Sequence, residues 1–349
     1  MNPSRVPPAE HPGPDRPRPD RPGPDRPRPD HGRPDLDPAE APTLPAWRHL
    51  YQRLSWIDRL IFGYLGYMTA RALLARPGPD TDRARLAFGL AFAGVGLALY
   101  LVRWPVLPAG VVRTLVHRLA HFTGVLGSYF WLREALHCTD PVLLDAPLAA
   151  IDRAVFGAVP SQWLEQFATP AVTEWFAFFY YSYFTILALA LVPAGLGGRS
   201  TRPFQLVFGI LYLICVGHMV YTLVPGLGPY ATLEFKGPLE GGVFLGLVME
   251  TVFGSGALLD IFPSLHTAVP AYIAVHCFRF RHHRPERYLW PVVAFFSANI
   301  IVATLLLRWH YGIDVIVGLL HCAGAVWWAR RLDRDEQRRA AVGLPPMLD

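Results

Sequence analysis

The stretch SANIIVATLLLRWHYGIDVIVGLLHCAGAVWW, residues 297–328, decides the fold. It joins two apolar runs through one short polar segment, RWHYGID at 308–314. Each run belongs to a segment of about 20 residues, the length that a helix needs to cross the hydrocarbon core of a bilayer. Backbone groups in lipid must be hydrogen-bonded within the segment, so we expect both runs to be helices.

Similar apolar segments recur from Trp56 onward. We count about eight, each near the length of a membrane span. They fall near 57–75, 86–106, 111–132, 173–195, 204–225, 264–280, 288–307 and 311–330. The first and third are the weakest, because arginines and a histidine lie within or beside them. The sequence therefore predicts an all-α, polytopic membrane protein with about eight transmembrane helices.

The composition agrees with a membrane protein. Of the 349 residues, 52% are hydrophobic and 17% are charged, whereas a soluble domain carries about 25% charged residues. The net charge of +5 comes almost wholly from arginine, since Lys236 is the only lysine. The arginines gather at the ends of apolar segments, so we expect a membrane and no nucleic acid as the partner. The four cysteines predict neither a disulfide framework nor a metal knuckle.

The two ends of the chain differ from its middle. The decapeptide PGPDRPRPDR at 12–21 returns with one change at 22–31, and such a Pro-, Asp- and Arg-rich region cannot form a core. We expect four parts: a disordered cytoplasmic tail at 1–46, two additional membrane helices at 47–110, a six-helix catalytic core at 111–331 and a cytoplasmic tail at 332–349. Within the core, apolar residues at helical spacing over 139–160 predict an amphipathic helix at the membrane interface.

The distribution of arginine predicts the orientation. The 279–287 connection and the end of the last apolar segment are rich in arginine, whereas the 133–172 and 226–262 connections are acidic. By the positive-inside rule, both termini face the cytoplasm and the acidic connections face outward. The 76–85 connection, with three arginines, is the exception. A composition this rich in arginine and poor in lysine also favours a GC-rich bacterial genome, hence a bacterial plasma membrane.

Two short motifs carry possible chemistry at the outer face. His310 and Asp314 are four residues apart, so on one helix the carboxylate would hold one imidazole nitrogen and leave the other as a nucleophile. In FPSLH at 262–266, a proline in the first helical turn would leave the N–H groups of Ser264, Leu265 and His266 as an anion site.

Each motif alone has a simpler explanation. A histidine beside a tyrosine is often an interfacial anchor, and a Pro-Ser helix start is ordinary capping. The two histidines are 44 residues apart, which allows one helical hairpin between them, and both are expected on the same side of the membrane. This joint occurrence favours a site. For His117 and His121, also four apart, we favour a hydrogen-bonded structural role over metal binding. For the aromatic run at 175–184 we favour an aromatic belt and helix packing over a substrate site.

The motifs resemble those of the type 2 phosphatidic acid phosphatase superfamily. Their residues are most similar to those of its inositol phosphorylceramide synthase (aureobasidin-resistance) branch. FPSLH resembles the second motif, and Ala303-Thr304 followed by His310-Tyr311 and Asp314 resembles the third. The resemblance covers about residues 111–331. It implies that His310 attacks phosphorus to form a phosphohistidine, that Asp314 orients His310, and that His266 protonates the leaving oxygen. It also implies Ser264 as a phosphate ligand and a mechanism without metal or cofactor.

The chain departs from the family at the first motif. A lysine and an Arg-Pro pair are expected after the span ending near Val224, but VPGLGPY at 224–230 has no basic residue. Arg308 is the nearest cation to the third motif, and Tyr230 could donate to a phosphate in place of the missing arginine. A phosphomonoester carries about −1.5 to −2 charges near neutral pH. One arginine and a helix N-terminus therefore suit a singly charged phosphodiester better.

We therefore expect a membrane enzyme that moves a phospho-headgroup of the inositol phosphate type from a phospholipid to a hydroxyl acceptor. The expected site residues are His310, Asp314 and His266 as catalysts, with Ser264, Leu265, Arg308 and Tyr230 at the substrate. Two alternatives stay open: a lipid phosphate or polyprenyl diphosphate phosphatase of the same fold, and a non-catalytic lipid-binding or transport scaffold. The expected partners are phospholipid or isoprenoid phosphate substrates and membrane lipids.

Overall fold

The computed structural model describes residues 53–104, 106–138, 142–196 and 201–343. Every regular element in these ranges is a helix, and the only strand-like pairing among them is an isolated bridge between Gly226 and Asp260. The expectation of an all-helical chain is confirmed for the described residues. The predicted tail at 1–46 lies outside them, as do residues 344–349 of the predicted C-terminal tail.

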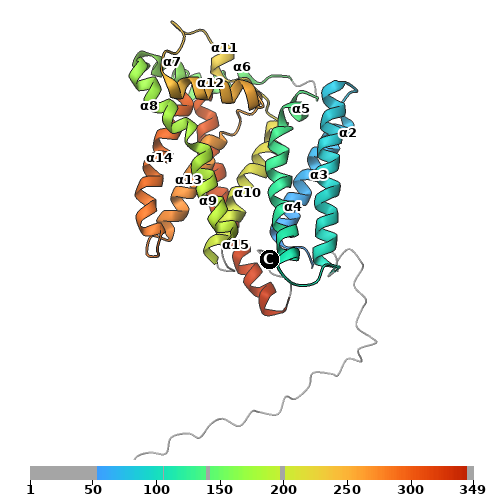
Figure 1. Ribbon diagram of the computed structural model, residues 1–349. Helices are drawn as coiled ribbons and strands as arrows, with labels where there is room; N and C mark the ends of the chain where they lie inside the picture. Colours follow the sequence, from blue (N-terminus) through green and yellow to red (C-terminus); the bar gives the residue numbers. More distant parts are fainter. Residues whose placement is uncertain (1–52, 105, 139–141, 197–200, 344–349) are drawn as a thin grey trace, which may run out of the picture. The chain divides into compact units, whose positions relative to one another are not determined.

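The helices fall into a first group of three long helices and a second group that carries the remaining elements (Figure 1). The first group and its extension are α2 (Trp56–Leu74), α3 (Pro79–Arg103), α4 (Val111–Phe130) and the short α5 (Leu132–His137). The rest are α6 (Asp145–Phe156), α7 (Pro160–Leu164), η1 (Glu165–Phe167), α8 (Pro170–Tyr181), α9 (Tyr183–Leu196), α10 (Thr201–Tyr221), α11 (Pro229–Thr232), α12 (Val243–Ser255), α13 (Leu265–Arg279), α14 (Glu286–Leu306) and α15 (Gly312–Ala341).

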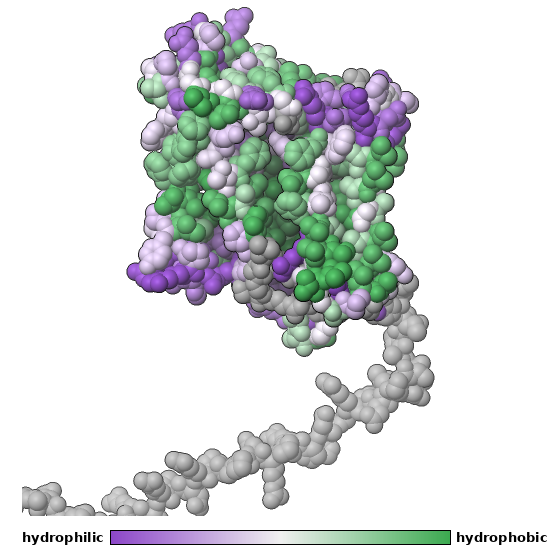
Figure 2. All heavy atoms as spheres, viewed as in Figure 1, coloured by the Kyte–Doolittle hydropathy of each residue, from purple (hydrophilic) through white to green (hydrophobic). Residues whose placement is uncertain are grey.

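Within the part of the chain that the structure describes, five helical segments are long and apolar enough to cross a membrane. They are Pro79–Arg103, Pro170–Ala194, Arg202–Tyr221, Glu286–Leu306 and Gly312–Ala341. The helices α2 and α4 carry charged and imidazole side chains, and α13 has only 15 residues. Figure 2 shows an apolar band across the middle of the molecule, with hydrophilic residues gathered above and below it. The protein is therefore a helical, multi-pass membrane protein.

The helix α13 lies at the centre of the second group and packs against α10, α14 and α15. The first group joins the second because α2 packs against α10. At this junction the Tyr64 hydroxyl lies 2.9 Å from Ser128 Oγ and 3.0 Å from His218 Nδ1, so the polar groups are satisfied within the apolar core.

The 76–85 connection carries three arginines although the predicted orientation places it outside. One of them, Arg85, has a local structural role. The guanidinium of Arg85 donates to the carbonyl oxygens of Ala72 at 3.0 Å and Ala75 at 2.8 Å. Ala72 lies in the last turn of α2 and Ala75 is its C-cap residue, whose N–H donates to the carbonyl of Ala72 at 3.4 Å. A basic side chain therefore stabilises the carbonyls at this helix end. The charge of Arg85 is thus used to cap a helix.

The helix α6 lies within the 139–160 segment for which an amphipathic helix is expected. Its two carboxylates, Asp145 and Asp152, are buried, while Ile151, Val155 and Phe156 are exposed. The face of this helix that packs on the protein thus carries both aspartates together with Leu148 and Ala149, while the other apolar residues point away from it.

Candidate active site

The turn between α14 and α15 places His310. The backbone N–H groups of Trp309 and His310 both donate to the carbonyl of Thr304, at 3.0 and 3.1 Å. Arg308 takes a left-handed conformation with φ of 69°, which reverses the chain after α14. Because α15 begins only at Gly312, His310 precedes the helix and does not lie on it, contrary to the expectation from spacing.

Asp314 nevertheless reaches His310. Its Oδ2 lies 3.4 Å from His310 Nδ1, and the same oxygen accepts the N–H of Tyr311 at 2.9 Å. Both side chains are buried, at 4% exposure for His310 and 0% for Asp314. The carboxylate thus faces Nδ1 and leaves the Nε2 side of the imidazole for chemistry.

The start of α13 brings in the second motif. Ser264 is the N-cap residue, and its Oγ accepts the N–H of Thr267 at 3.2 Å. Its own N–H donates to the carbonyl of Asp314 at 3.1 Å, so it is not the open donor that the sequence suggested, and Pro263 lies before the cap. The first N–H groups of the helix, those of Leu265 and His266, have no partner within α13. The Ser264–Asp314 bond ties the two motifs together.

His266 lies across from His310, with 6.2 Å between the ring centroids. Two tyrosines hold the His266 ring: Tyr180 stacks on it at 4.4 Å with an interplanar angle of 13°, and Tyr183 lies at 4.3 Å. For this aromatic run the sequence pointed to a belt and helix packing and not to the site, yet part of it packs on a candidate catalyst. No spacing rule links residue 180 with residue 266, so the sequence carried no signal for this contact.

A cavity of about 70 Å³ opens between the two histidines. Residues from five separate regions line it, among them Tyr129, Tyr180, Asp260, His266, Trp309 and His310. None of the described residues that line it is a lysine or an arginine. The volume exceeds the about 10–15 Å³ that one water molecule needs, so the cavity has room for a small polar group.

Asp260 is a site residue that the sequence did not predict. Burial raises the pKa of this carboxyl above its ordinary value, while the neighbouring His310 acts in the opposite direction. The one sequence signal is its position two residues before the FPSLH motif. A carboxyl with a raised pKa beside two imidazoles adds a third titratable group to the cavity.

Two of the expected substrate ligands lie outside this cavity. The guanidinium of Arg308 donates to Glu165 at 3.2 Å and to the carbonyl of Gly237 at 2.9 Å, and its Nε is buried without a hydrogen-bond partner. The ring of Tyr230 stacks on Trp309 at 5.1 Å, and its N–H donates to the carbonyl of Arg308 at 2.8 Å. Both residues therefore contact the turn that carries His310.

The buried face of α6 holds the loops around the site. Asp152 accepts the N–H groups of Gly312 at 2.7 Å and Ile313 at 2.8 Å, which are the first of α15. Asp145 accepts the N–H groups of Leu227 at 3.0 Å and Gly228 at 2.8 Å. The two aspartates are seven residues apart, so they lie on one face of the helix. This spacing could have predicted that both hold neighbouring loops.

A second, larger cavity of about 850 Å³ runs between α4, α9 and α10. Its size falls in the range of about 300–1,000 Å³ that is usual for ligand pockets, and its lining is mostly apolar. Four residues line both cavities: Tyr129, Phe184, Asp260 and His266. In Figure 2 a recess marks the apolar band between these helices. The pocket between the histidines thus adjoins a long apolar chamber.

Comparison with known proteins agrees with this geometry. A family model described as the PAP2 superfamily matches residues 146–328, just over half of the chain, from α6 into α15. The matched range contains His266, His310 and Asp314 and leaves out α2, α3 and α4. Neither a search of curated proteins nor a search of solved structures gives a match.

Proposed function

Because this chain belongs to the PAP2 superfamily, and is thus a lipid phosphatase or phosphotransferase type of enzyme, we propose that it transfers a phospho-headgroup through a phosphohistidine. The donor is a phospholipid, the group is of the inositol phosphate type, and the acceptor is a hydroxyl group. The observation that carries the proposal is the pair of imidazoles, His266 and His310, 6.2 Å apart across one cavity.

In the first half-reaction, Nε2 of His310 attacks phosphorus and forms an N–P bond. The bond between phosphorus and the leaving oxygen breaks, and protonated His266 gives its proton to that oxygen. Attack needs about 3 Å between the reacting atoms, and proton transfer needs a similar distance on the other side. The separation of the two rings is compatible with a phosphoryl group lying between them.

In the second half-reaction, the acceptor hydroxyl attacks phosphorus, its proton passes to neutral His266, and the N–P bond to His310 breaks. Asp314 keeps Nδ1 of His310 oriented and compensates the positive charge on its ring in both steps. The N–H groups of Leu265 and His266, at the N-terminus of α13, would bind the phosphate oxygens, with the capping residue Ser264 setting the helix start.

The charge of the site supports a phosphodiester as the donor. The described lining of the cavity holds no basic residue other than histidine, and Arg308 is already paired with Glu165. A dianionic monoester would lack a counter-charge, whereas a diester carries a single negative charge. The expected contacts of Arg308 and Tyr230 with the phosphate stay predictions. Nε of Arg308 is buried without a hydrogen-bond partner, so this nitrogen could donate to a phosphate oxygen.

The larger cavity supports a lipid substrate. It adjoins the catalytic pocket at His266 and follows α4 from Val111 to Tyr129. Eighteen residues of helix correspond to about 27 Å, close to the thickness of a hydrocarbon core. A phospholipid or isoprenoid tail would lie in this chamber while its phosphate reaches the histidines.

The proposed arrangement in the membrane has about eight helical crossings, with α13 and the less apolar α2 and α4 added to the five apolar spans. Residues 111–331 form the six-helix core. The connection between α13 and α14, rich in arginine, lies at the end opposite α6 and α11 (Figure 1). By the positive-inside rule, the termini face the cytoplasm of a bacterial cell and the active site faces outward.

A second candidate is hydrolysis of a lipid phosphate or polyprenyl diphosphate by the same residues. The cavity has room for water beside His266 and His310, which favours hydrolysis if no acceptor lipid enters. A non-catalytic scaffold is disfavoured, because such a protein would not need two histidines and an aspartate arranged around one cavity.

The test offers purified protein a phosphatidylinositol-type diester and a phosphomonoester lipid together, and follows both by mass spectrometry. We expect wild type to consume the diester and His310→Ala to consume neither lipid. Loss of phosphate from the monoester alone would establish the phosphatase. Turnover of neither lipid by wild type, with or without a hydroxyl acceptor lipid, would contradict the proposal. Parallel assays with and without chelator test the expected independence from metal.

A further inference from the structure

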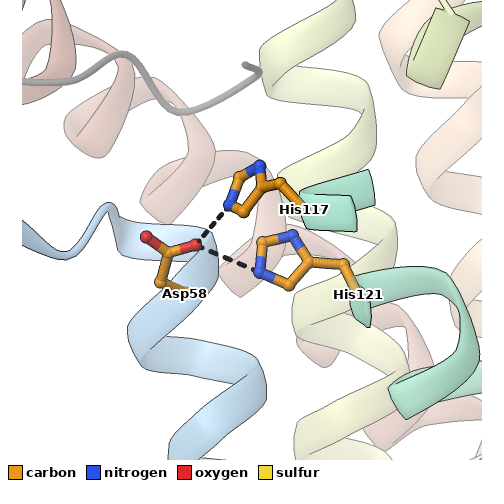
Figure 3. A group of neighbouring side chains, drawn as sticks. All are labelled: Asp58, His117 and His121. Carbon is orange, nitrogen blue, oxygen red and sulfur yellow. Dashed lines mark hydrogen bonds and ion pairs between the residues drawn. The ribbon is translucent and has the colours of Figure 1, made fainter. Parts of the chain in front are cut away.

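A cluster of two histidines and one aspartate lies between α2 and α4 (Figure 3), and none of its three residues lines the catalytic cavity. Nε2 of His117 and Nε2 of His121 approach the same oxygen of Asp58, Oδ1, at 2.8 and 3.0 Å. The side chains of Asp58 and His117 are buried, and that of His121 is 12% exposed. The imidazoles come from one face of α4, and the carboxylate comes from α2.

The other oxygen of Asp58 is held by different donors. Its Oδ2 accepts the N–H of Ser55 at 2.8 Å and Nε–H of Arg103 at 2.8 Å. These bonds fix the orientation of the carboxylate and leave Oδ1 facing the two imidazoles. Such hydrogen bonding to the outer oxygen of a carboxylate is the usual support for a metal-binding carboxylate.

Hydrogen bonding alone gives His117 conflicting roles. Its Nε2 lies 2.8 Å from Asp58 Oδ1, which requires a donor, and 3.1 Å from a terminal nitrogen of Arg103, which requires an acceptor. One imidazole nitrogen cannot be both. A cation among the three ligand atoms would take the lone pairs of both imidazoles and of Oδ1 together.

We propose that Asp58, His117 and His121 form a binding site for a divalent transition-metal ion, with zinc as the ion that fits best. Two imidazole nitrogens and one carboxylate oxygen are a common zinc ligand set, and the ligand atoms all lie within 4.8 Å of one another. Bonds of about 2.0–2.1 Å in a tetrahedral site would place the ligand atoms about 3.3 Å apart. The distances from Oδ1 to the two imidazole nitrogens, 2.8 and 3.0 Å, need to increase by only a few tenths of an ångström.

A fourth ligand could reach the metal ion from the large apolar cavity. Both histidines line the large apolar cavity. The charges of Asp58 and Arg103 cancel, so a divalent ion would keep its positive charge and favour an anionic fourth ligand, such as hydroxide or a lipid phosphate oxygen, from the cavity.

The ion would not take part in the proposed phosphoryl transfer. From His121, the nearer of the two imidazoles, to Tyr129, which lines the catalytic cavity, the chain runs eight residues along α4, or about 12 Å. The ligands lie outside the range that matches the PAP2 superfamily, in the helices that this chain adds to it. The structural consequence is a metal link between α2 and α4, with Arg103 of α3 bound to the same carboxylate.

The test measures metal content and does not depend on turnover. Full-length protein with a histidine-free affinity tag is stripped with chelator in detergent, incubated with zinc, desalted and analysed by elemental mass spectrometry. We expect about one zinc ion per wild-type chain, and a loss of at least about tenfold in His121→Gln. The control His282→Gln, an exposed residue of the 279–287 connection, should bind as wild type does.

Two further measurements keep the proposal falsifiable if a variant fails to fold. Cobalt(II) bound to wild type should show the intense visible absorption of a tetrahedral site, and zinc should raise the Tm of stripped wild type but not of His121→Gln. Equal zinc content in wild type and a folded His121→Gln, or a wild type that retains no zinc and gives no cobalt spectrum, would overturn the proposal. The cluster would then be an ion pair with two hydrogen-bonded imidazoles. Failure of the lipid assay would not affect any of these results.

Discussion

Asp314 contacts His310 and the backbone beside it with one oxygen: Oδ2 lies 3.4 Å from His310 Nδ1 and 2.9 Å from the amide nitrogen of Tyr311. The carboxylate therefore fixes the imidazole and the start of α15 at once. Replacing Asp314 by asparagine keeps the shape and removes the charge that stabilises a positively charged imidazole.

For Asp314→Asn we expect kcat of lipid turnover to fall by about 10²–10⁴-fold with little change in KM, because only the proton and phosphoryl transfer steps need the charge. Steady-state kinetics in detergent micelles checks this. A rise in KM with kcat unchanged would show that Asp314 acts on substrate binding instead.

Asp152 is predicted to hold the start of α15 from α6. It accepts the N–H groups of Gly312 at 2.7 Å and Ile313 at 2.8 Å and is fully buried. In Asp152→Asn one of the two oxygens becomes an amide nitrogen, so one charge-assisted hydrogen bond, worth about 1.5–3 kcal/mol, is lost. We expect a lower Tm and reduced turnover.

Thermal unfolding of purified protein measures the effect of Asp152→Asn. Asp80→Asn is the matched control, because the Asp80 side chain is 55% exposed and lies far along the chain from the site. Equal Tm values for Asp152→Asn and wild type would contradict the role assigned to α6.

Gly228 is predicted to be required by the turn that carries His310. Its φ is 90°, and a Cβ atom there would lie 2.5 Å from the carbonyl oxygen of Trp309. Gly228→Ala should therefore destabilise the protein by more than about 1 kcal/mol, and the displaced turn should lower kcat by up to about 100-fold. In Gly237→Ala, where a Cβ atom meets nothing within 4 Å, both quantities should stay near wild type.

Arg308 and Glu165 together test the phosphate contact. If Arg308 reaches the substrate, Arg308→Ala lowers kcat/KM for the diester, whereas Glu165→Gln frees the guanidinium from its 3.2 Å ion pair and preserves turnover. We expect this pattern in a kinetic comparison of the two variants. Equal losses in both would show that the pair only supports the turn.

Asp260 is predicted to make stability depend on pH. Burial raises the pKa of this carboxyl in the folded protein above its unfolded value. Its contribution to stability is therefore fully present below the unfolded pKa and is lost as pH rises through the folded pKa. Asp260→Asn is neutral at every pH, so its Tm relative to wild type should increase from about pH 4 to about pH 8. A difference in Tm that stays constant over this range would contradict the burial of an ionisable group at this position.

The sequence by itself determined the helical membrane architecture and the two motifs. Apolar segments such as 288–307 and 311–330 predict helices because the lipid environment leaves a continuous chain few other ways to satisfy its backbone. Residue type and local spacing were enough to select His266, His310 and Asp314 as candidates, and their catalytic roles stay predictions. Element bounds were less accurate, since the left-handed turn at Arg308 places His310 before α15.

Only the tertiary structure decided which distant groups meet. Asp58 reaches His117 across 59 residues, and Asp152 reaches Gly312 across 160. The rings of Tyr180 and Tyr183, from α8 and α9, pack on His266 of α13. Local spacing has no information on such contacts, because they depend on how the helices pack. Buried carboxylates need partners, and helix packing supplies different ones to each. Asp152 caps a helix, Asp58 is a candidate metal ligand, and Asp260 is a titratable group of the candidate active-site cavity.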